Sequence, residues 1–112
     1  MAESNELDML EEDAFALTRV ALAISEARET KDDAALTQSL DENLRLWVAI
    51  RTLLKQEGNT IPADIKANLL RLSKYVTQKT FELQDGITDQ ALESLVNTNL
   101  QIAEGILEGR TA

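Results

Sequence analysis

The chain consists of long stretches without glycine or proline, in which apolar residues recur at steps of three and four. Its glycines are Gly58, Gly86, Gly105 and Gly109, and its one proline is Pro62. Steps of three and four place side chains on one face of an α-helix. A half-buried strand shows alternation of apolar and polar residues, and no segment of strand length shows it. The pattern therefore predicts an all-α chain.

Four helices are expected, at about 5–29, 31–57, 62–84 and 89–108. Thr30 and Asp33 form a weak capping-box signal before the second helix. Pro62 suits the first position of the third helix, because its missing N–H would be unpaired there. Gly58 tolerates the left-handed conformation that ends a helix. Because the loops are short, we expect a small antiparallel bundle in which residues 1–112 form a single helical domain.

Each expected helix has an apolar stripe that should face the core. The stripes are Leu7, Leu10, Ala14, Leu17, Ala21 and Ile24; Leu36, Leu40, Leu44, Trp47, Ile50 and Leu54; Ile65, Leu69, Leu72, Val76 and Leu83; and Leu92, Leu95, Val96, Ile102 and Ile106. Alanines hold much of the first stripe, so the first helix should bury the least area per turn. We expect it to be the most weakly packed helix, and whether it stays docked or is displaced by a partner is left open.

The composition argues against catalysis. The chain has no Cys and no His, so thiolate nucleophiles, Cys- or His-based metal sites and the usual neutral general base are absent. Its carboxylates lie in charge runs that match no EF-hand loop, and no glycine-rich phosphate loop is present. We interpret these runs as solvated helix faces, and we expect no enzymatic activity, no metal site and no cofactor.

Charge and hydropathy bear on location and partners. Eleven basic and twenty acidic residues give a net charge of −9, which disfavours nonspecific binding to nucleic acid or anionic membranes. No stretch is apolar enough to span a membrane, and the acidic start does not resemble a secretory signal. We therefore expect a cytoplasmic protein without a membrane partner.

The charge is unevenly distributed along the chain. The segment from Arg45 to Glu82 has a net charge of +4, whereas the rest of the chain has −13. The bases of this segment are Arg45, Arg51, Lys55, Lys66, Arg71, Lys74 and Lys79. The simpler interpretation is that the second and third helices have basic outer faces that complement the other two. The alternative is a surface for an acidic partner or RNA.

Several residues stand out within the helical pattern. Trp47 falls on an apolar stripe, which favours core packing over a role as a partner-binding hot spot. Asn68 and Asn99 lie beside stripes, where a buried amide needs hydrogen-bond partners, so structural anchoring is favoured over partner recognition. Gly105 lowers the helix propensity of the fourth helix, which suggests that another backbone approaches it closely.

Three motifs occur in order between Asp41 and Leu107. They are Asn43-Leu44-Arg45-Leu46-Trp47, then Ile61-Pro62-Ala63-Asp64-Ile65-Lys66-Ala67-Asn68-Leu69, and then Leu95-Val96-Asn97-Thr98-Asn99 followed by Ile102-Ala103-Glu104-Gly105-Ile106. This succession resembles the FlaF family of flagellar biosynthesis regulators from alphaproteobacteria. The resemblance marks Asn43, Arg45, Trp47, Pro62, Asn68, Asn99 and Gly105 as candidate partner-binding or structural residues.

The resemblance implies a small helical protein of flagellar biogenesis. Its expected role is that of a secretion-chaperone-like partner of flagellin that couples flagellin synthesis to export. A groove between helices can hold an amphipathic flagellin terminus. The alternative is a post-transcriptional regulator of flagellin mRNA, which acts with an FlbT-like partner or contacts RNA directly through segment 45–82. The oligomeric state stays open.

Overall fold

The computed structural model of the chain describes residues 2–58 and 61–111, with side chains described for residues 11–58 and 61–108. It contains four helices in this part of the chain, namely α1 (Ala2–Glu29), α2 (Asp33–Lys55), α3 (Ala63–Glu82) and α4 (Asp89–Thr111). No strand occurs among these residues, so the predicted all-α fold is confirmed. The stripe positions Leu7 and Leu10 lie in α1, but their side chains are outside the described residues.

The turn between α1 and α2 differs from the sequence prediction. The cap of α2 is Asp32, whose carboxylate accepts a hydrogen bond from the Ala35 N–H at 3.0 Å. The predicted cap, Thr30, was wrong: its hydroxyl instead donates to the Glu26 carbonyl at 2.9 Å, in the last turn of α1. Between these residues Lys31 has φ 55°, the left-handed conformation in which many helices end. A left-handed lysine thus makes this turn without a glycine.

The starts of α3 and α4 are defined by local hydrogen bonds. Pro62 is the N-cap of α3 rather than its first helical residue, and its carbonyl accepts a hydrogen bond from the Lys66 N–H at 2.9 Å. The Thr88 hydroxyl accepts a hydrogen bond from the Ala91 N–H at 3.1 Å, as expected for the cap of α4. After α2, Gly58 has φ 81°, in the left-handed region predicted for it.

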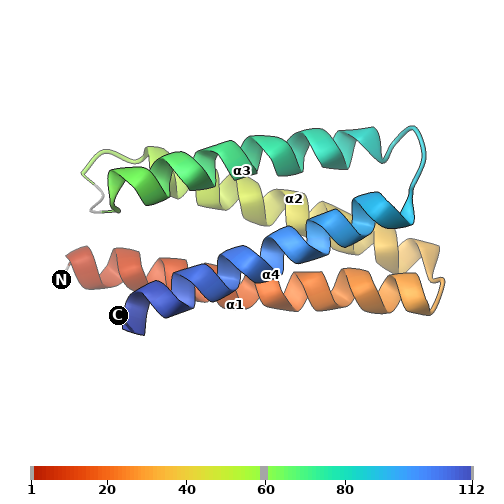
Figure 1. Cartoon of the computed structure of the whole chain (residues 1–112), viewed down its shortest axis with the longest axis horizontal. Helices are drawn as coiled ribbons and strands as arrows, with labels where there is room; N and C mark the ends of the chain where they lie inside the picture. Colours follow the sequence, from red (N-terminus) through yellow and green to blue (C-terminus); the bar gives the residue numbers. More distant parts are fainter. Residues whose placement is uncertain (1, 59–60, 112) are drawn as a thin grey trace.

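The helices form an elongated antiparallel bundle of 44 × 23 × 19 Å (Figure 1). α1 packs along both α2 and α4, whereas α3 packs chiefly on α2. α3 and α4 contact each other least of the neighbouring pairs, and their ribbons diverge toward the end where α3 begins (Figure 1). One side of α3 is therefore only partly covered.

The predicted stripes form most of the core. Leu17, Ile24, Trp47, Ile50 and Leu95 are at most 1% exposed. The main exception is the first residue of the third stripe: Ile65 is 44% exposed, because it lies at the end of α3 where α4 has moved away. The remaining stripe residues that are only half-buried are Leu44, Leu72, Val96, Ile102 and Ile106.

The expected weak packing of the first helix was wrong for the part whose side chains are described. Ala14, Leu17, Ala21 and Ile24 are all at 0% exposure, and α1 contacts two neighbours along its length. Interaxial distance depends on the side chains at the contact, so alanines allow close approach of α2 and α4. Small side chains here bring helices together instead of weakening the contact.

Candidate functional site

Three of the residues singled out in the sequence meet in one buried polar cluster. The Trp47 indole Nε1–H donates a hydrogen bond to Asn99 Oδ1 at 2.9 Å. The Asn99 Nδ2 group donates to Asn43 Oδ1 at 2.6 Å and to the Leu17 carbonyl at 3.3 Å. Trp47, Asn99 and Asn43 are all 0% exposed. The cluster joins α2 and α4 to the backbone of α1.

The cluster holds three helices in one register. A buried indole N–H or amide is stable only when it is hydrogen-bonded, and sliding α4 along α1 or α2 would break these bonds. One group is not satisfied: Asn43 Nδ2 has no hydrogen-bond partner among the described residues. Because full burial keeps these side chains from any docked partner, their geometry supports a structural role.

The other singled-out residues do not join the cluster. Arg45 is exposed and forms an ion pair with Asp41 one turn earlier, with 2.9 Å between Arg45 Nε and Asp41 Oδ2. Asn68 is half-buried, and its side-chain oxygen accepts a hydrogen bond from Arg71 on the same helix. Pro62 caps α3 at the surface. These three residues lie on the surface of α2 and α3.

The prediction for Gly105 was wrong. Gly105 is exposed, and no neighbouring atom lies within 4 Å of the position that a Cβ would take there. Another backbone does not approach it closely. The missing side chain leaves open space on the outer face of α4, and the structure gives no packing reason for a glycine at this position.

No cluster with the arrangement of a catalytic or metal centre occurs in the part of the chain that is described. No group of three Asp or Glu side chains there lies close enough to hold a metal ion. One carboxyl group is perturbed: burial, and then the charge of neighbouring Glu12, raises the pKa of Asp13 from 3.8 to about 6. The chain has no His or Cys, and no base among the described residues forms an ion pair with Asp13.

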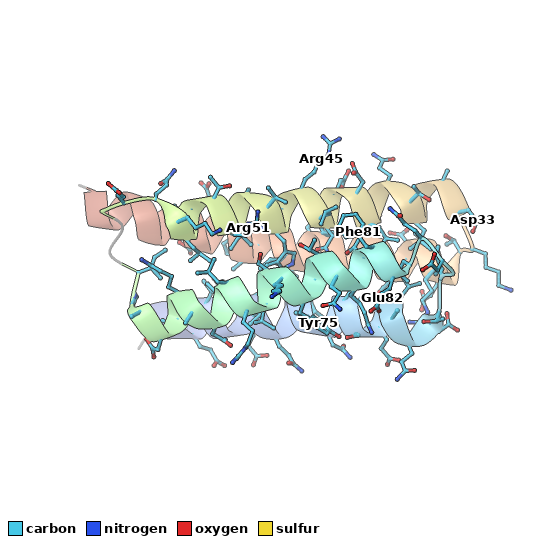
Figure 2. All side chains as sticks on the ribbon, turned by 90° about the horizontal axis from the view of Figure 1, so that it is seen from above. Asp33, Arg45, Arg51, Tyr75, Phe81 and Glu82 are labelled. Atoms are coloured by element: carbon cyan, nitrogen blue, oxygen red, sulfur yellow. The ribbon has the colours of Figure 1, made fainter. Side chains whose placement is uncertain are left out.

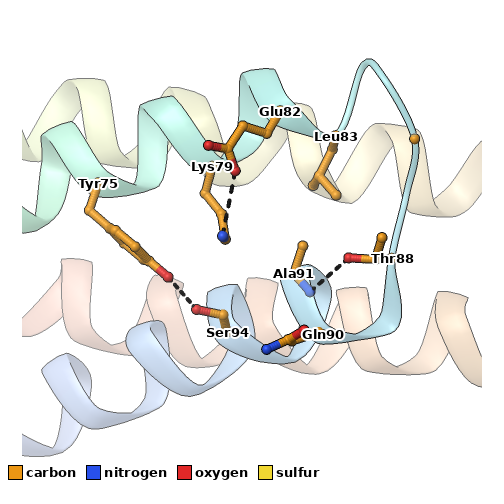
Figure 3. Close-up of a pocket in the computed structure, with 9 residues that line it drawn as sticks. Tyr75, Lys79, Glu82, Leu83, Thr88, Gln90, Ala91 and Ser94 are labelled. Carbon is orange, nitrogen blue, oxygen red and sulfur yellow. Dashed lines mark hydrogen bonds and ion pairs between the residues drawn. The ribbon is translucent and has the colours of Figure 1, made fainter.

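The partly covered side of α3 contains a polar hollow of ≈ 380 Å³ (Figure 3). The Tyr75 and Ser94 hydroxyls share a hydrogen bond that bridges α3 and α4. Lys79 Nζ lies 3.5 Å from Glu82 and 6.0 Å from the centroid of the Tyr75 ring. The lining residues are Tyr75, Lys79, Glu82, Leu83, Gly86, Thr88, Gln90, Ala91 and Ser94. This lining is too polar to cover an apolar helix face.

A second hollow, of ≈ 510 Å³, lies on the opposite flank of α3, beside α2. Its lining residues, which we call the α2–α3 groove, are Arg51, Lys74, Thr77, Gln78, Phe81, Glu82 and Asp85. In Figure 2, Arg51 and Phe81 lie between α2 and α3, whereas Tyr75 lies on the other flank of α3. Phe81 is 54% exposed, and Val48, one turn before Arg51, is 47% exposed. This groove combines exposed apolar and basic side chains.

A third hollow, of ≈ 430 Å³, lies between α1 and α4 and is lined by Thr18, Leu100, Ala103, Glu104, Leu107 and Glu108. Its two charged residues are both acidic, whereas the α2–α3 groove has two basic and two acidic residues.

The three sequence motifs contain none of the groove residues, although Arg51 and Lys74 stood out as bases of segment 45–82. Phe81 and Val48 lie off the apolar stripes. An apolar residue outside the stripe does not pack in the core, so its position could have indicated a binding surface. The Leu17 carbonyl in the buried cluster could not be identified from the sequence, because every residue has a backbone carbonyl. The motif residues therefore identify the core, and the exposed apolar residues identify the candidate binding surface.

These features define a small helical-bundle protein with a polar cluster in its core and grooves on its surface. Over the residues that the structure describes, none of the helices has the length and apolar character of a membrane span. A family model described as "Flagellar protein FlaF" matches residues 2–106, so the chain belongs to the FlaF family of flagellar proteins. Comparisons with curated proteins and with solved structures give no significant match.

Proposed function

We propose that this FlaF-family protein binds flagellin as a secretion-chaperone-like partner in the cytoplasm and couples flagellin synthesis to export. Membership of a flagellar family supports the pathway. The absence of His and Cys from the sequence supports a binding role over an enzymatic one.

The observation that carries this proposal is the set of exposed apolar side chains on and beside α3. Phe81 on α3 and Val48 on α2 are 54% and 47% exposed, and α3 is held mainly by α2. An amphipathic helix binds by placing apolar anchors in a groove between helices. The terminal helices of flagellin, which assemble with one another in the filament, are ligands of this kind.

Binding to flagellin kept monomeric tests the proposal directly. Isothermal calorimetry and copurification should detect a complex with the wild-type protein. Trp47→Ala serves as a destabilised control, because loss of the buried indole costs about 3–5 kcal/mol, and its folding must be checked by circular dichroism. If folded wild-type protein and monomeric flagellin form no complex, the proposal is wrong.

A second candidate is post-transcriptional regulation of flagellin mRNA, through an FlbT-like partner or by direct RNA contact. It is favoured by the bases Arg51, Lys55 and Lys74, which form no ion pair with a described residue. Direct RNA binding should weaken steeply with salt and fall on charge reversal at Arg51, Lys55, Arg71 and Lys74. Absence of RNA binding at low salt would exclude the direct form of this function.

A further inference from the structure

The α2–α3 groove has a composition found in neither of the other hollows. Phe81 presents more than half of its surface to solvent at the groove, and Val48, which does not line the hollow, is 47% exposed on α2 one turn before Arg51. The hollow between α3 and α4 is bridged by hydroxyl groups, and the hollow between α1 and α4 carries Glu104 and Glu108. In the hollow between α3 and α4, the base beside the Tyr75 ring is Lys79, which forms an ion pair with Glu82, whereas the α2–α3 groove places the exposed Phe81 ring beside Arg51 and Lys74, which form no ion pair with a described residue.

The bases of this groove are available for a partner. Arg51 and Lys74 line it and form no ion pair with a described residue. Arg45 is not part of it: that side chain pairs with Asp41 and points away from α3 (Figure 2). The acids of the groove are Glu82, which pairs with Lys79, and Asp85 in the turn after α3. Both bases of the groove thus form no ion pair with a described residue, whereas one of its two acids is paired, in a chain whose net charge is −9.

We infer that the α2–α3 groove binds an amphipathic helix of a protein partner, with apolar anchors on Phe81 and Val48 and acidic residues beside Arg51 and Lys74. This inference rests on the proposed function, because it assumes that the ligand is a helix of a protein partner. It goes further by naming the groove that binds this helix and the charge that the helix carries. Charge complementarity determines the sign of the partner helix's charge. A basic helix would be repelled by Arg51 and Lys74 and could not accept hydrogen bonds from them.

A protein helix fits this surface better than RNA does. Val48 offers aliphatic surface that nucleic acid uses little, whereas an apolar helix face buries it. RNA would also bring dense negative charge close to the acidic remainder of the chain, and an acidic helix brings only a few charges. A second copy of this chain is a weaker fit, since its exposed Phe15 and Leu22 lie on α1 across the bundle and would produce open-ended chains.

Two synthetic peptides provide the test. Each has about 18 residues, enough for about five helical turns, and both share one leucine stripe. One carries glutamate beside the leucines and its twin carries lysine. Fluorescence anisotropy of labelled peptide should show the glutamate peptide binding at least ~10-fold more tightly than its twin, with the difference shrinking as salt rises.

Matched variants locate the binding site. Phe81→Ser removes a ring that is 54% exposed in the groove, and Phe15→Ser removes a ring of equal exposure on α1. Lys74→Glu reverses a groove charge, and Arg19→Glu makes the same change of charge on the exposed face of α1. We expect the two groove variants to weaken binding of the glutamate peptide by ~5-fold or more, and the two α1 variants to leave it unchanged. Circular dichroism checks that all four variants are folded.

The outcomes separate this inference from the proposed function. The inference is overturned if both peptides bind equally well, or if the α1 variants lose as much affinity for the glutamate peptide as the groove variants do. It is also overturned if Phe81→Ser abolishes RNA binding or self-association but leaves peptide binding intact. If the glutamate peptide binds in the groove but flagellin forms no complex, the inference stands and the proposed function fails. If flagellin binds and the groove variants bind it equally well, the inference fails and the proposed function stands.

Discussion

Replacing Asn99 by leucine should lower the free energy of unfolding by about 3 kcal/mol. Asn99 is fully buried and is the central member of the polar cluster, because it bonds to Trp47, Asn43 and the Leu17 carbonyl. The substitution removes all three bonds at once. Leucine fills the space with an apolar side chain, so the loss arises mainly from the polar groups left behind.

The magnitude follows from those groups. The Trp47 Nε1–H loses its acceptor at 2.9 Å, and Asn43 Oδ1 loses its donor at 2.6 Å. Each buried polar group left without a partner costs about 1–3 kcal/mol. Part of this cost is offset by the apolar surface that leucine buries, which leaves a net loss of about 3 kcal/mol. Folded domains have about 5–15 kcal/mol of stability, so the variant should still fold.

Asn43→Leu is the matched comparison, and it should cost far less. Asn43 Nδ2 has no partner among the described residues, so the substitution removes a buried group that already carries this penalty. Asn99 Nδ2 keeps the Leu17 carbonyl, and Trp47 keeps its acceptor. The change in unfolding free energy should lie within about 1 kcal/mol of zero.

Urea denaturation followed by circular dichroism measures both variants and the Asn43→Leu/Asn99→Leu double variant. The double variant should be more stable than the sum of the two single changes predicts, because it leaves only the Trp47 N–H unpaired. The reasoning is refuted if Asn99→Leu and Asn43→Leu change stability equally, or if Asn99→Leu costs less than about 1 kcal/mol.

Three further changes test local features by the same denaturation assay. Gly105→Ala should raise stability by about 0.5–1 kcal/mol, because the added methyl group meets open space in α4, and a loss would show a hidden contact. Lys31→Gly should raise it by up to about 1 kcal/mol, because φ 55° strains a residue with a Cβ, and no gain would argue against that strain. Burial and the charge of Glu12 raise the pKa of Asp13 to about 6, so the folded chain binds this proton more tightly than the unfolded chain does. Stability from this group should fall as pH rises from about 4 to about 6, and the stability gained by Asp13→Asn should widen over that interval; a constant difference would contradict the raised pKa.

The fold could be predicted from the sequence because helical periodicity is a local property. The stripes placed Leu17, Ile50 and Leu95 in the core correctly. The errors arose where neighbouring helices decide the outcome. Ile65 follows the stripe, but α4 diverges from it, and Ala14 and Ala21 make a close contact although alanine buries little area by itself. Such effects depend on the distance between helices, which periodicity does not report.

The candidate site could be predicted only in part, for a related reason. The motifs marked Asn43, Trp47 and Asn99, but their convergence depends on how α2 and α4 meet across α1. Gly105 was misread because low helix propensity does not reveal whether the surrounding space is filled. The groove at Phe81 was missed because the motifs do not include that residue.

Trp47, Asn43 and Asn99 lie in the core and Phe81 and Val48 lie on the surface, so substitutions in the two sets affect different properties of this protein. A change at Asn99 or Trp47 alters groups at 0% exposure and lowers the stability of the bundle, so a loss of partner binding in such a variant would not by itself identify a contact. A change at Phe81 or Lys74 alters exposed side chains at the groove, so the proposed binding should fall while the urea midpoint changes little. A loss of binding therefore identifies a contact with a partner only when the stability of the same variant is also measured. The α2–α3 groove is where this distinction can be made, because its apolar and charged groups can be changed one at a time without disturbing the buried cluster.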